Sequence, residues 1–296
     1  MKCKDVFLRL SDSRVTYDEY TKALDTLREF DTPPDCISAL VSFVESPPHQ
    51  TPNPPWYAPN ILAEVMRVGS KWVYKSTLDE TTAYRLIRGA ILHRRAFNYA
   101  FVFDVWLFLK HLIGKYFGNF DPELQSGPIT DLIEVIKKSA YTDYKALDLL
   151  LAMFPLSTFG APELEIDCQF MIKIVSTHEY LPIYYCCELL KHLINGQLLI
   201  PSKTDIFSLI EAFLIILENN PDDNIRLEAV RGLQLIWINV YPNYQRIKVP
   251  GLQLNLRFEE LKKYQKGLWC DILAPKDVEH LMYRYLLRLR DSFSMI

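Results

Sequence analysis

Glycine is scarce in this chain, with 10 among 296 residues. Sheet-rich folds use glycine in many tight turns, so its shortage argues against such a fold and favours helix. A hydrophobic share of 49% beside 23% charged residues is typical of a globular chain rather than a disordered one. A folded protein of this length buries about three quarters of the surface that its unfolded chain exposes, so we expect a sizeable core.

An excess of one charge sign is also lacking. The formal net charge is −3, which gives no overall electrostatic reason to expect nucleic acid or an anionic membrane as the main partner. The longest apolar run, residues 96–113, holds Asp104 and Lys110. Because a carboxylate at its centre is costly in hydrocarbon, the run predicts a buried helix of a soluble protein and no membrane partner.

Cysteines with CxxC spacing are missing. A structural zinc site needs clustered Cys and His, and the adjacent Cys186 and Cys187 would point to different faces of a helix, so we expect no metal. The chain opens MKCKDVF without an apolar signal segment. We therefore expect reduced thiols in a cytoplasmic or nuclear protein. The six cysteines are Cys3, Cys36, Cys168, Cys186, Cys187 and Cys270.

Sequence motifs that carry catalysis are absent as well. The chain has no GxxxxGK(S/T), GxGxxG, HExxH or GxSxG pattern, and its six histidines are isolated from one another. Asp104 is the single candidate acid, because a carboxylate in so apolar a stretch must be paired, cap a neighbour or face a groove. We expect a protein that is not an enzyme and that needs no cofactor.

Apolar residues at helical spacing begin near the N-terminus. Thr16 and Glu19 stand in capping-box positions, which predicts a helix over residues 16–30. Residues 36–44 carry apolar side chains at i, i+3, i+4 and i+7, the pattern of a second amphipathic helix. We expect an N-terminal helical hairpin within residues 1–46.

A proline-rich segment follows, with the sequence SPPHQTPNPPWYAP at residues 46–59. Its prolines remove backbone donors and exclude both helix and central strand, so residues 47–59 are predicted to be a linker or a long loop. Trp56 and Tyr57 could dock this loop on the main body. In the alternative interpretation it is a recognition segment, where phosphorylation at Ser46-Pro47 or Thr51-Pro52 would create an arginine-binding site.

Residues 60–296 are predicted to form a helical-repeat array. Helical patterns recur in pairs at residues 130–139 and 143–154, 163–177 and 181–193, and 204–218 and 224–240. The pair starts lie about 35 to 40 residues apart, within the range of helical-hairpin arrays. An all-α fold is therefore expected, an α-solenoid in which antiparallel helix pairs stack into a superhelix.

One unit of this array resembles a known family. Residues 222–233, DDNIRLEAVRGL, resemble the second-helix signature of a HEAT repeat, with an acidic turn, an Ile-Arg pair, a small residue and Leu. The helices near residues 143 and 180, DYKALDLLLAMF and EYLPIYYCCELLKHL, lack the Ile-Arg step, so HEAT, armadillo and irregular solenoid stay open. The resemblance implies a right-handed superhelix whose usual work is to bind other proteins.

The C-terminal region predicts two further features. Pro275 opens a last helix that caps the array, with Arg288 near its end to complement the helix dipole. Before it, residues 244–257 break the helical period and alternate apolar with polar residues, which predicts an extended segment or hairpin.

These patterns predict a scaffold or adaptor subunit that binds a protein partner through the second helices of its pairs, within a larger complex. In the alternative, a C-terminal basic face that includes residues 262–266 and 284–290 binds nucleic acid or an acidic protein tail, with a strong dependence on salt. The residues predicted to contact the partner are Arg226, Arg231, Trp237, Tyr241, Arg284, Arg288, Trp56 and Tyr57.

Overall fold

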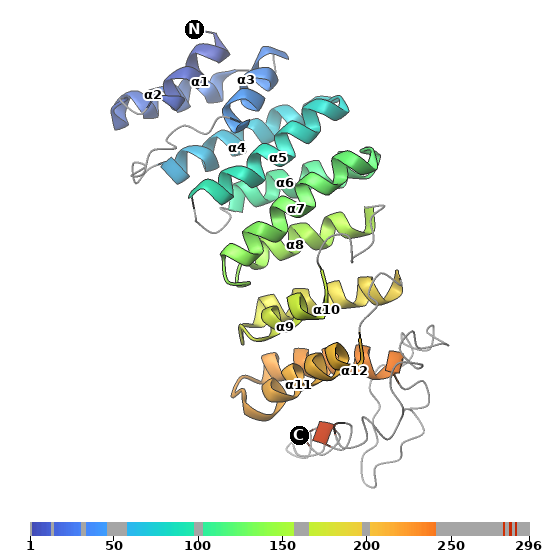
Figure 1. Cartoon of the computed structure of the whole chain (residues 1–296). Helices are drawn as coiled ribbons and strands as arrows, with labels where there is room; N and C mark the ends of the chain where they lie inside the picture. Colours follow the sequence, from blue (N-terminus) through green and yellow to red (C-terminus); the bar gives the residue numbers. More distant parts are fainter. Residues whose placement is uncertain are drawn as a thin grey trace. The chain divides into compact units, whose positions relative to one another are not determined.

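The computed structural model describes residues 2–12, 15–30, 34–45, 58–97, 103–156, 166–196 and 202–240, together with Leu281, Arg284, Tyr285 and Arg288. Every regular element in these residues is helical, which confirms the predicted all-α fold (Figure 1). The chain forms two compact units, Met1–Phe159 and Gly160–Ile296.

The helices of the first unit fall into pairs that are consecutive in the chain. Its described helices are α1 (Cys3–Ser11), α2 (Tyr17–Glu29), α3 (Pro34–Glu45), α4 (Ala58–Lys75), α5 (Glu80–Phe97), α6 (Phe103–Tyr116), the short η1 (Phe117–Asn119), α7 (Pro122–Lys138), α8 (Tyr144–Met153) and the short η2 (Phe154–Leu156). The pairs α1–α2, α3–α4, α5–α6 and α7–α8 each pack together. We call the even-numbered members of these pairs the second helices.

The pairs of the first unit stack in two layers. Each odd-numbered helix packs on the next odd-numbered one, from α1 through α3 and α5 to α7. Each second helix likewise packs on the next, from α2 through α4 and α6 to α8. The second unit repeats this arrangement with α9 (Cys168–Val175), α10 (Tyr180–Asn195), α11 (Lys203–Asn219) and α12 (Asp223–Val240), since α9 packs on α10 and α11, and α12 on α10 and α11.

Several helices begin where a side chain satisfies the free backbone N–H groups of the first turn. The predicted capping box of α2 is present: Thr16 Oγ1 accepts from the Glu19 backbone N–H, and a Glu19 carboxylate oxygen accepts from the Thr16 N–H at 3.0 Å. Ser202 and Asp205 make the same reciprocal pair at the start of α11. These local signals explain why the predicted helices at residues 16–30 and 204–218 agree with the structure.

The predicted helix over residues 96–113 is wrong in its extent. The apolar run is divided between two helices, because α5 continues to Phe97 and α6 begins at Phe103. Asp104 therefore lies in the first turn of α6 rather than at the centre of a helix. A carboxylate is favourable there, since the helix dipole places positive potential at the N-terminus.

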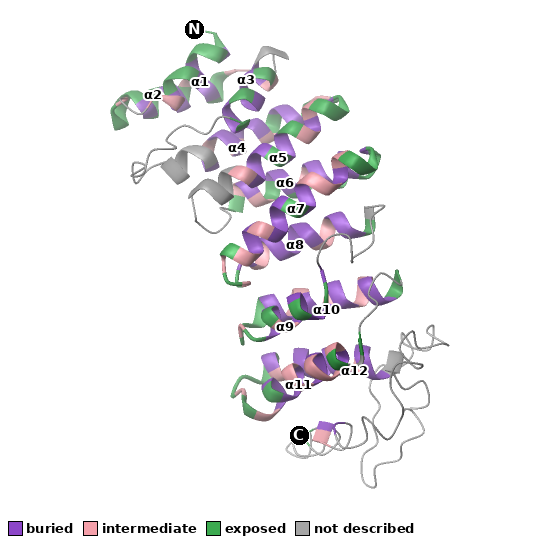
Figure 2. Cartoon of the chain, viewed as in Figure 1, coloured by how far each residue is buried: buried purple, intermediate pink, exposed green. Residues whose placement is uncertain are grey.

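The core consists mainly of leucine, isoleucine, valine and phenylalanine side chains. Figure 2 shows that each α-helix combines buried positions with intermediate or exposed ones along its described length. Two glycines permit the closest approaches. A Cβ atom on Gly89 of α5 would lie 2.7 Å from Val44 Cγ1 of α3, and one on Gly232 of α12 would lie 2.5 Å from the Phe213 ring of α11. With a larger residue at these positions, α5 could not approach α3 as closely, nor α12 approach α11.

Polar bridges join successive pairs in both layers. Each bridge joins a side chain of one pair to a side chain of the next, and the arginines and lysines involved are partly exposed, which limits what each bridge contributes to stability. The bridges are Arg28–Glu64, Arg85–Glu45, Arg88–Asp131 and Lys110–Asp148 in the first unit, and Arg231–Glu188 in the second.

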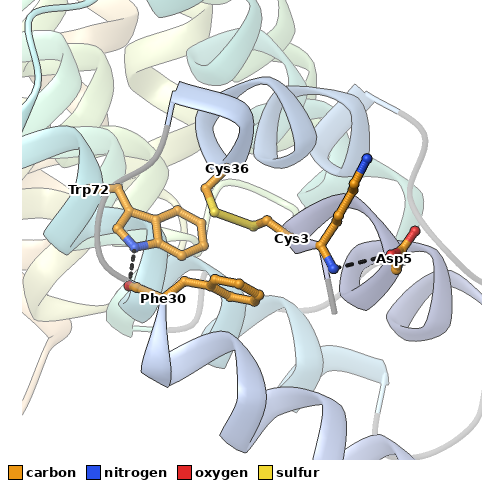
Figure 3. The surroundings of a disulfide bond; sticks show 6 residues. Cys3, Asp5, Phe30, Cys36 and Trp72 are labelled. Carbon is orange, nitrogen blue, oxygen red and sulfur yellow. Dashed lines mark hydrogen bonds between the residues drawn. A yellow bond between two sulfur atoms is a disulfide. The ribbon is translucent and has the colours of Figure 1, made fainter.

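A disulfide joins Cys3 of α1 to Cys36 of α3, both buried (Figure 3). Beside it, the Trp72 indole N–H donates to the Phe30 carbonyl oxygen at 3.3 Å. The expectation that the cysteines are all reduced is therefore wrong for this pair, which the sequence could not reveal because 33 residues separate the two thiols. Cys168, Cys186 and Cys187 are free and buried.

Some predictions lie outside the described residues. These include the proline-rich segment up to residue 57 and the extended segment at residues 244–257, and the division of the chain at residues 46 and 59 stays a prediction. Among the helices that the structure describes, none is both long and apolar enough to span a membrane.

Candidate partner-binding surface

Large apolar side chains that face solvent are unevenly distributed between the two layers. Of those in the described residues, only Leu8 on α1 and Ile215 on α11 belong to odd-numbered helices. The others lie on second helices, in both units: Tyr17, Tyr74, Phe103, Leu107, Tyr180, Leu181 and Leu227. Exposed apolar side chains that gather on one face mark interaction surfaces more often than scattered ones do.

In the second unit these side chains come from α10 and α12, which pack on each other. Tyr180 and Leu181 open α10, and the Tyr184 ring follows one turn later, with its centroid 6.4 Å from that of Tyr180. Leu227, which is 53% exposed, lies on α12. We call Tyr180, Leu181, Tyr184, Leu227 and Arg231 the α10–α12 surface.

Arg231 is the charged group of this surface, and neighbouring side chains hold it in place. Its guanidinium pairs with the Glu188 carboxylate of α10, donates to Glu228 Oε2 at 3.4 Å, and lies 5.4 Å from the centroid of the Tyr184 ring. The backbone of Glu228 in α12 is also attached to α10, because the Cys187 thiol of α10 donates to the Glu228 carbonyl oxygen at 3.4 Å. An arginine already held in one conformation loses little side-chain entropy when a partner contacts it.

Burial sets the electrostatics of this cluster. It raises the pKa of the Glu228 carboxyl above its usual value, and the nearby Arg231 guanidinium opposes that rise. Arg231 thus faces two carboxyl groups, Glu188 and Glu228, so its positive charge is compensated within the second unit. The α10–α12 surface is therefore aromatic and aliphatic with little net charge.

The structure places the predicted contact residues in different settings. Arg226 is half-buried and pairs with Asp223 in the first turn of α12, five residues before Arg231. Trp237 is fully buried, with its ring 6.1 Å from that of Tyr285, so its position is in the core of the second unit. Trp56, Tyr57 and Tyr241 lie outside the described residues.

Arg284 and Arg288 also differ from each other. The Arg284 guanidinium donates two bonds to the Glu218 carboxylate, at 3.0 and 2.8 Å, and two to Glu211 of the same helix, α11. The Glu218 bonds, together with Glu211, raise the pKa of Arg284 above its usual value. Arg288 is exposed. Arg284 therefore fastens the C-terminal helical residues to α11, where its charge is paired with two carboxylates.

Sequence reasoning missed four members of the α10–α12 surface, although the signals were present. Tyr180, Leu181 and Tyr184 belong to the run YLPIYY, in which apolar residues cover more of a helix than one buried stripe needs. Leu227 is out of phase with the buried residues Ile225 and Ala229, since a residue two positions along a helix lies on nearly the opposite face.

The second unit also has an open hollow of about 550 Å³ between α9, α11 and Leu281. Its walls are mainly apolar, with Ile172, Phe207 and Ile215, and Glu211 at its edge already bonds to Arg284. Among the described residues that line the hollow, the carboxylate that could orient a small ligand, Glu211, is thus already paired.

Groups that could support catalysis or bind a metal are few in the described residues. They contain no group of three or more His, Cys, Asp or Glu side chains placed to hold a metal ion. Burial raises the pKa of the Cys168 thiol to about 12 and raises those of Cys186 and Cys187 as well, so all three stay protonated at neutral pH. A protonated buried thiol is a poor nucleophile.

No protein-family model, no curated protein and no solved structure matches this chain. Its function must therefore be inferred from its own surfaces.

Proposed function

We propose that this chain is a non-enzymatic scaffold or adaptor subunit that binds a protein partner through its second helices. The observation that carries the proposal is the gathering of exposed large apolar side chains on those helices, with Leu8 and Ile215 as the exceptions among the described residues. Aromatic and aliphatic side chains in contact with solvent gain free energy when a partner covers them.

The proposed architecture is an α-solenoid of HEAT or armadillo type, in which antiparallel helix pairs stack. Support comes from the packing of consecutive pairs in two layers, which recurs in both units. Stacked helix pairs of this kind present one continuous helix layer to a partner. The HEAT-like residues 222–233 lie at the start of α12, where they contribute Leu227 and Arg231 to the α10–α12 surface.

The composition of the α10–α12 surface suits a protein partner. Binding hot spots are rich in tyrosine and arginine, and this surface combines Tyr180 and Tyr184 with the immobilised Arg231. Its leucines would fill the apolar part of the interface. Nucleic-acid binding through the C-terminal arginines has less support, because Arg284 already bonds to two carboxylates.

The test is affinity purification of the tagged full-length chain from cells, followed by mass spectrometry. We expect a stoichiometric partner, and we expect Leu227→Asp to reduce its recovery roughly tenfold, since a carboxylate at the centre of an apolar contact stays desolvated and unpaired. Leu8→Asp is the matched control, because Leu8 is 60% exposed but lies on α1 in the other layer.

Circular dichroism must show that both variants keep the helix content of the wild type. The proposal would be contradicted by a chain that is always recovered alone as a monomer, or by equal recovery of the partner with Leu227→Asp and with the wild type.

A further inference from the structure

A second exposed apolar region lies on the first unit, where α4 and α6 pack on each other. Tyr74 of α4 is 60% exposed, and Phe103 and Leu107 of α6 are 56% and 42% exposed. The same two helices carry four lysines, of which we group Lys71, Lys110 and Lys115 with these side chains. We call Lys71, Tyr74, Phe103, Leu107, Lys110 and Lys115 the α4–α6 surface.

Ring and lysine contacts connect the two helices across this surface. The exposed Tyr74 ring lies against His111 of α6, with 3.7 Å between centroids. One turn beyond His111, the Lys115 ammonium donates to the Ser76 carbonyl oxygen at 3.2 Å, at the end of α4. These contacts hold the exposed tyrosine and the lysine in fixed positions relative to each other.

The other end of the surface is aromatic. The Phe103 and Trp106 rings lie 5.5 Å apart, and the Lys110 ammonium lies 5.0 Å from the Trp106 ring. Leu107 is one helical turn from both Phe103 and Lys110, so the apolar and cationic groups alternate along α6.

Positive charge on this surface is only partly compensated. Lys110 bonds to the Asp148 carboxylate of α8 at 2.8 Å. Lys71, by contrast, has no ionic or hydrogen-bond partner among the described side chains, and Lys115 meets a carbonyl oxygen rather than a carboxylate.

The nearby acids are engaged elsewhere or lie at the edge. Glu64 bonds to Arg28 and Arg67, and Asp79 accepts from the Thr82 backbone N–H at the start of α5. Asp104 lies at the start of α6, three turns from Lys115. At the end of the surface that contains Tyr74, the Lys71 and Lys115 ammonium groups are therefore not paired with a carboxylate of the described residues.

We propose that the α4–α6 surface binds an acidic segment of a partner protein that also carries apolar side chains. The inference rests on the proposed function, because it names the chemistry of a partner for one of the second-helix surfaces. Carboxylates of the segment pair with Lys71 and Lys115, while its apolar side chains cover Tyr74, Phe103 and Leu107. A protein segment fits better than a nucleic acid, since the exposed Leu107 is aliphatic and the apolar side chains of a peptide can cover it.

Gly114 offers a clean way to test this surface. It lies on α6, one turn beyond Lys110 and next to Lys115, and a Cβ atom built on it meets nothing within 4 Å beyond its chain neighbours and the backbone of its own helix. Gly114→Glu therefore adds a negative charge to the surface without disturbing the packing. Lys71→Glu reverses a charge at an exposed position of α4. Lys4→Glu, at an exposed position of α1, is the matched charge-reversal control.

The experiment measures fluorescence anisotropy of three labelled probes with the full-length chain at low ionic strength. The probes are a short peptide that alternates glutamate with leucine and phenylalanine, the same peptide with lysine in place of glutamate, and a single-stranded oligothymidylate. We expect the acidic peptide to bind most tightly, and its Kd to rise roughly tenfold in Lys71→Glu and in Gly114→Glu, with little change in Lys4→Glu.

The inference is overturned if the acidic peptide does not bind, if oligothymidylate binds more tightly, or if the three variants behave alike. Those results do not affect the proposed function if the Leu227→Asp variant still recovers less of the co-purified partner than the wild type. Conversely, if the co-purification test failed, weaker binding of the acidic peptide to Lys71→Glu and Gly114→Glu would still support the inference about the α4–α6 surface.

Discussion

Gly89 and Gly114 are both helical glycines, yet their surroundings are opposite. A Cβ on Gly89 would meet Val44 Cγ1 at 2.7 Å and the Val44 carbonyl group at 3.1 Å, whereas a Cβ on Gly114 would meet nothing within 4 Å. Because backbone atoms cannot move aside easily, we expect Gly89→Ala to lower the free energy of unfolding by about 1–3 kcal/mol. Gly114→Ala should raise it by about 0.5–1 kcal/mol, since alanine is the better helix former.

Urea unfolding followed by circular dichroism measures both changes. Equal effects of the two substitutions would contradict the close contact of α3 and α5 at Gly89.

The surroundings of His111 predict how the stability of the protein depends on pH. Burial lowers the pKa of its imidazole below the ordinary 6.5, and the Lys115 ammonium lowers it further. The folded state then binds this proton more weakly than the unfolded chain, so the free energy of unfolding falls as the pH drops from about 7 towards the lowered pKa. His111→Phe keeps a ring against Tyr74 but cannot titrate. We expect its unfolding free energy to fall less steeply than that of the wild type between about pH 7 and pH 5.

Urea midpoints of both proteins across this pH range provide the comparison. Parallel curves would show that His111 is protonated as readily in the folded protein as in the unfolded chain.

At the scale of elements, Arg284 controls how the C-terminal helical residues attach to α11. Its removal leaves the mostly buried Glu218 carboxylate without its guanidinium partner. We expect Arg284→Ala to lower the free energy of unfolding by about 1 kcal/mol, a figure discounted for partial exposure. Arg288→Ala, at an exposed position, should change it by less than about 0.5 kcal/mol. Chemical denaturation of the two variants decides this, and an Arg288→Ala effect as large as that of Arg284→Ala would contradict it.

The disulfide between α1 and α3 makes a second prediction at this scale. Cross-linking residues 33 positions apart restricts the unfolded chain, which corresponds to about 3.7 kcal/mol of stability on the chain-entropy account. We expect Cys36→Ser to lower the unfolding midpoint under non-reducing conditions and to lose its difference from the wild type in dithiothreitol. Mass spectrometry after alkylation should find Cys3 and Cys36 unmodified in the oxidised protein, and alkylation of both without reductant would contradict the bond.

The sequence predicted individual helices well because their signals are local. Thr16 and Glu19 are three residues apart, and their capping box determines where α2 begins. The sequence did not reveal contacts between residues that are far apart along the chain. Neither the pairing of Cys3 with Cys36 nor that of Arg231 with Glu188 leaves a mark in the local pattern, because each depends on how helices stack. For the same reason the aromatic residues of α10 and Leu227 could not be assigned to one surface.

At the scale of the whole molecule, both units contain the same periodic contacts. Bridges between successive pairs join residues that are 40 positions apart at Glu45–Arg85, 43 at Arg88–Asp131 and 43 at Glu188–Arg231. These separations are close to the spacing of about 35 to 40 residues that the helical patterns predict. The repeat length is therefore visible in side-chain contacts although no residue motif recurs from pair to pair.

Because the chain forms two compact units, we expect the first unit to fold without the second. Helices α1 to α8 pack on one another within Met1–Phe159, and each layer of this unit has its own buried apolar residues and polar bridges. Nearest-neighbour packing of this kind lets part of a helical array fold without the rest. We expect residues 1–159, expressed alone, to be helical by circular dichroism and to unfold cooperatively in urea. Gly89→Ala should destabilise this fragment as it does the full chain, whereas a fragment that lacks a cooperative transition would show that the first unit needs the second to fold.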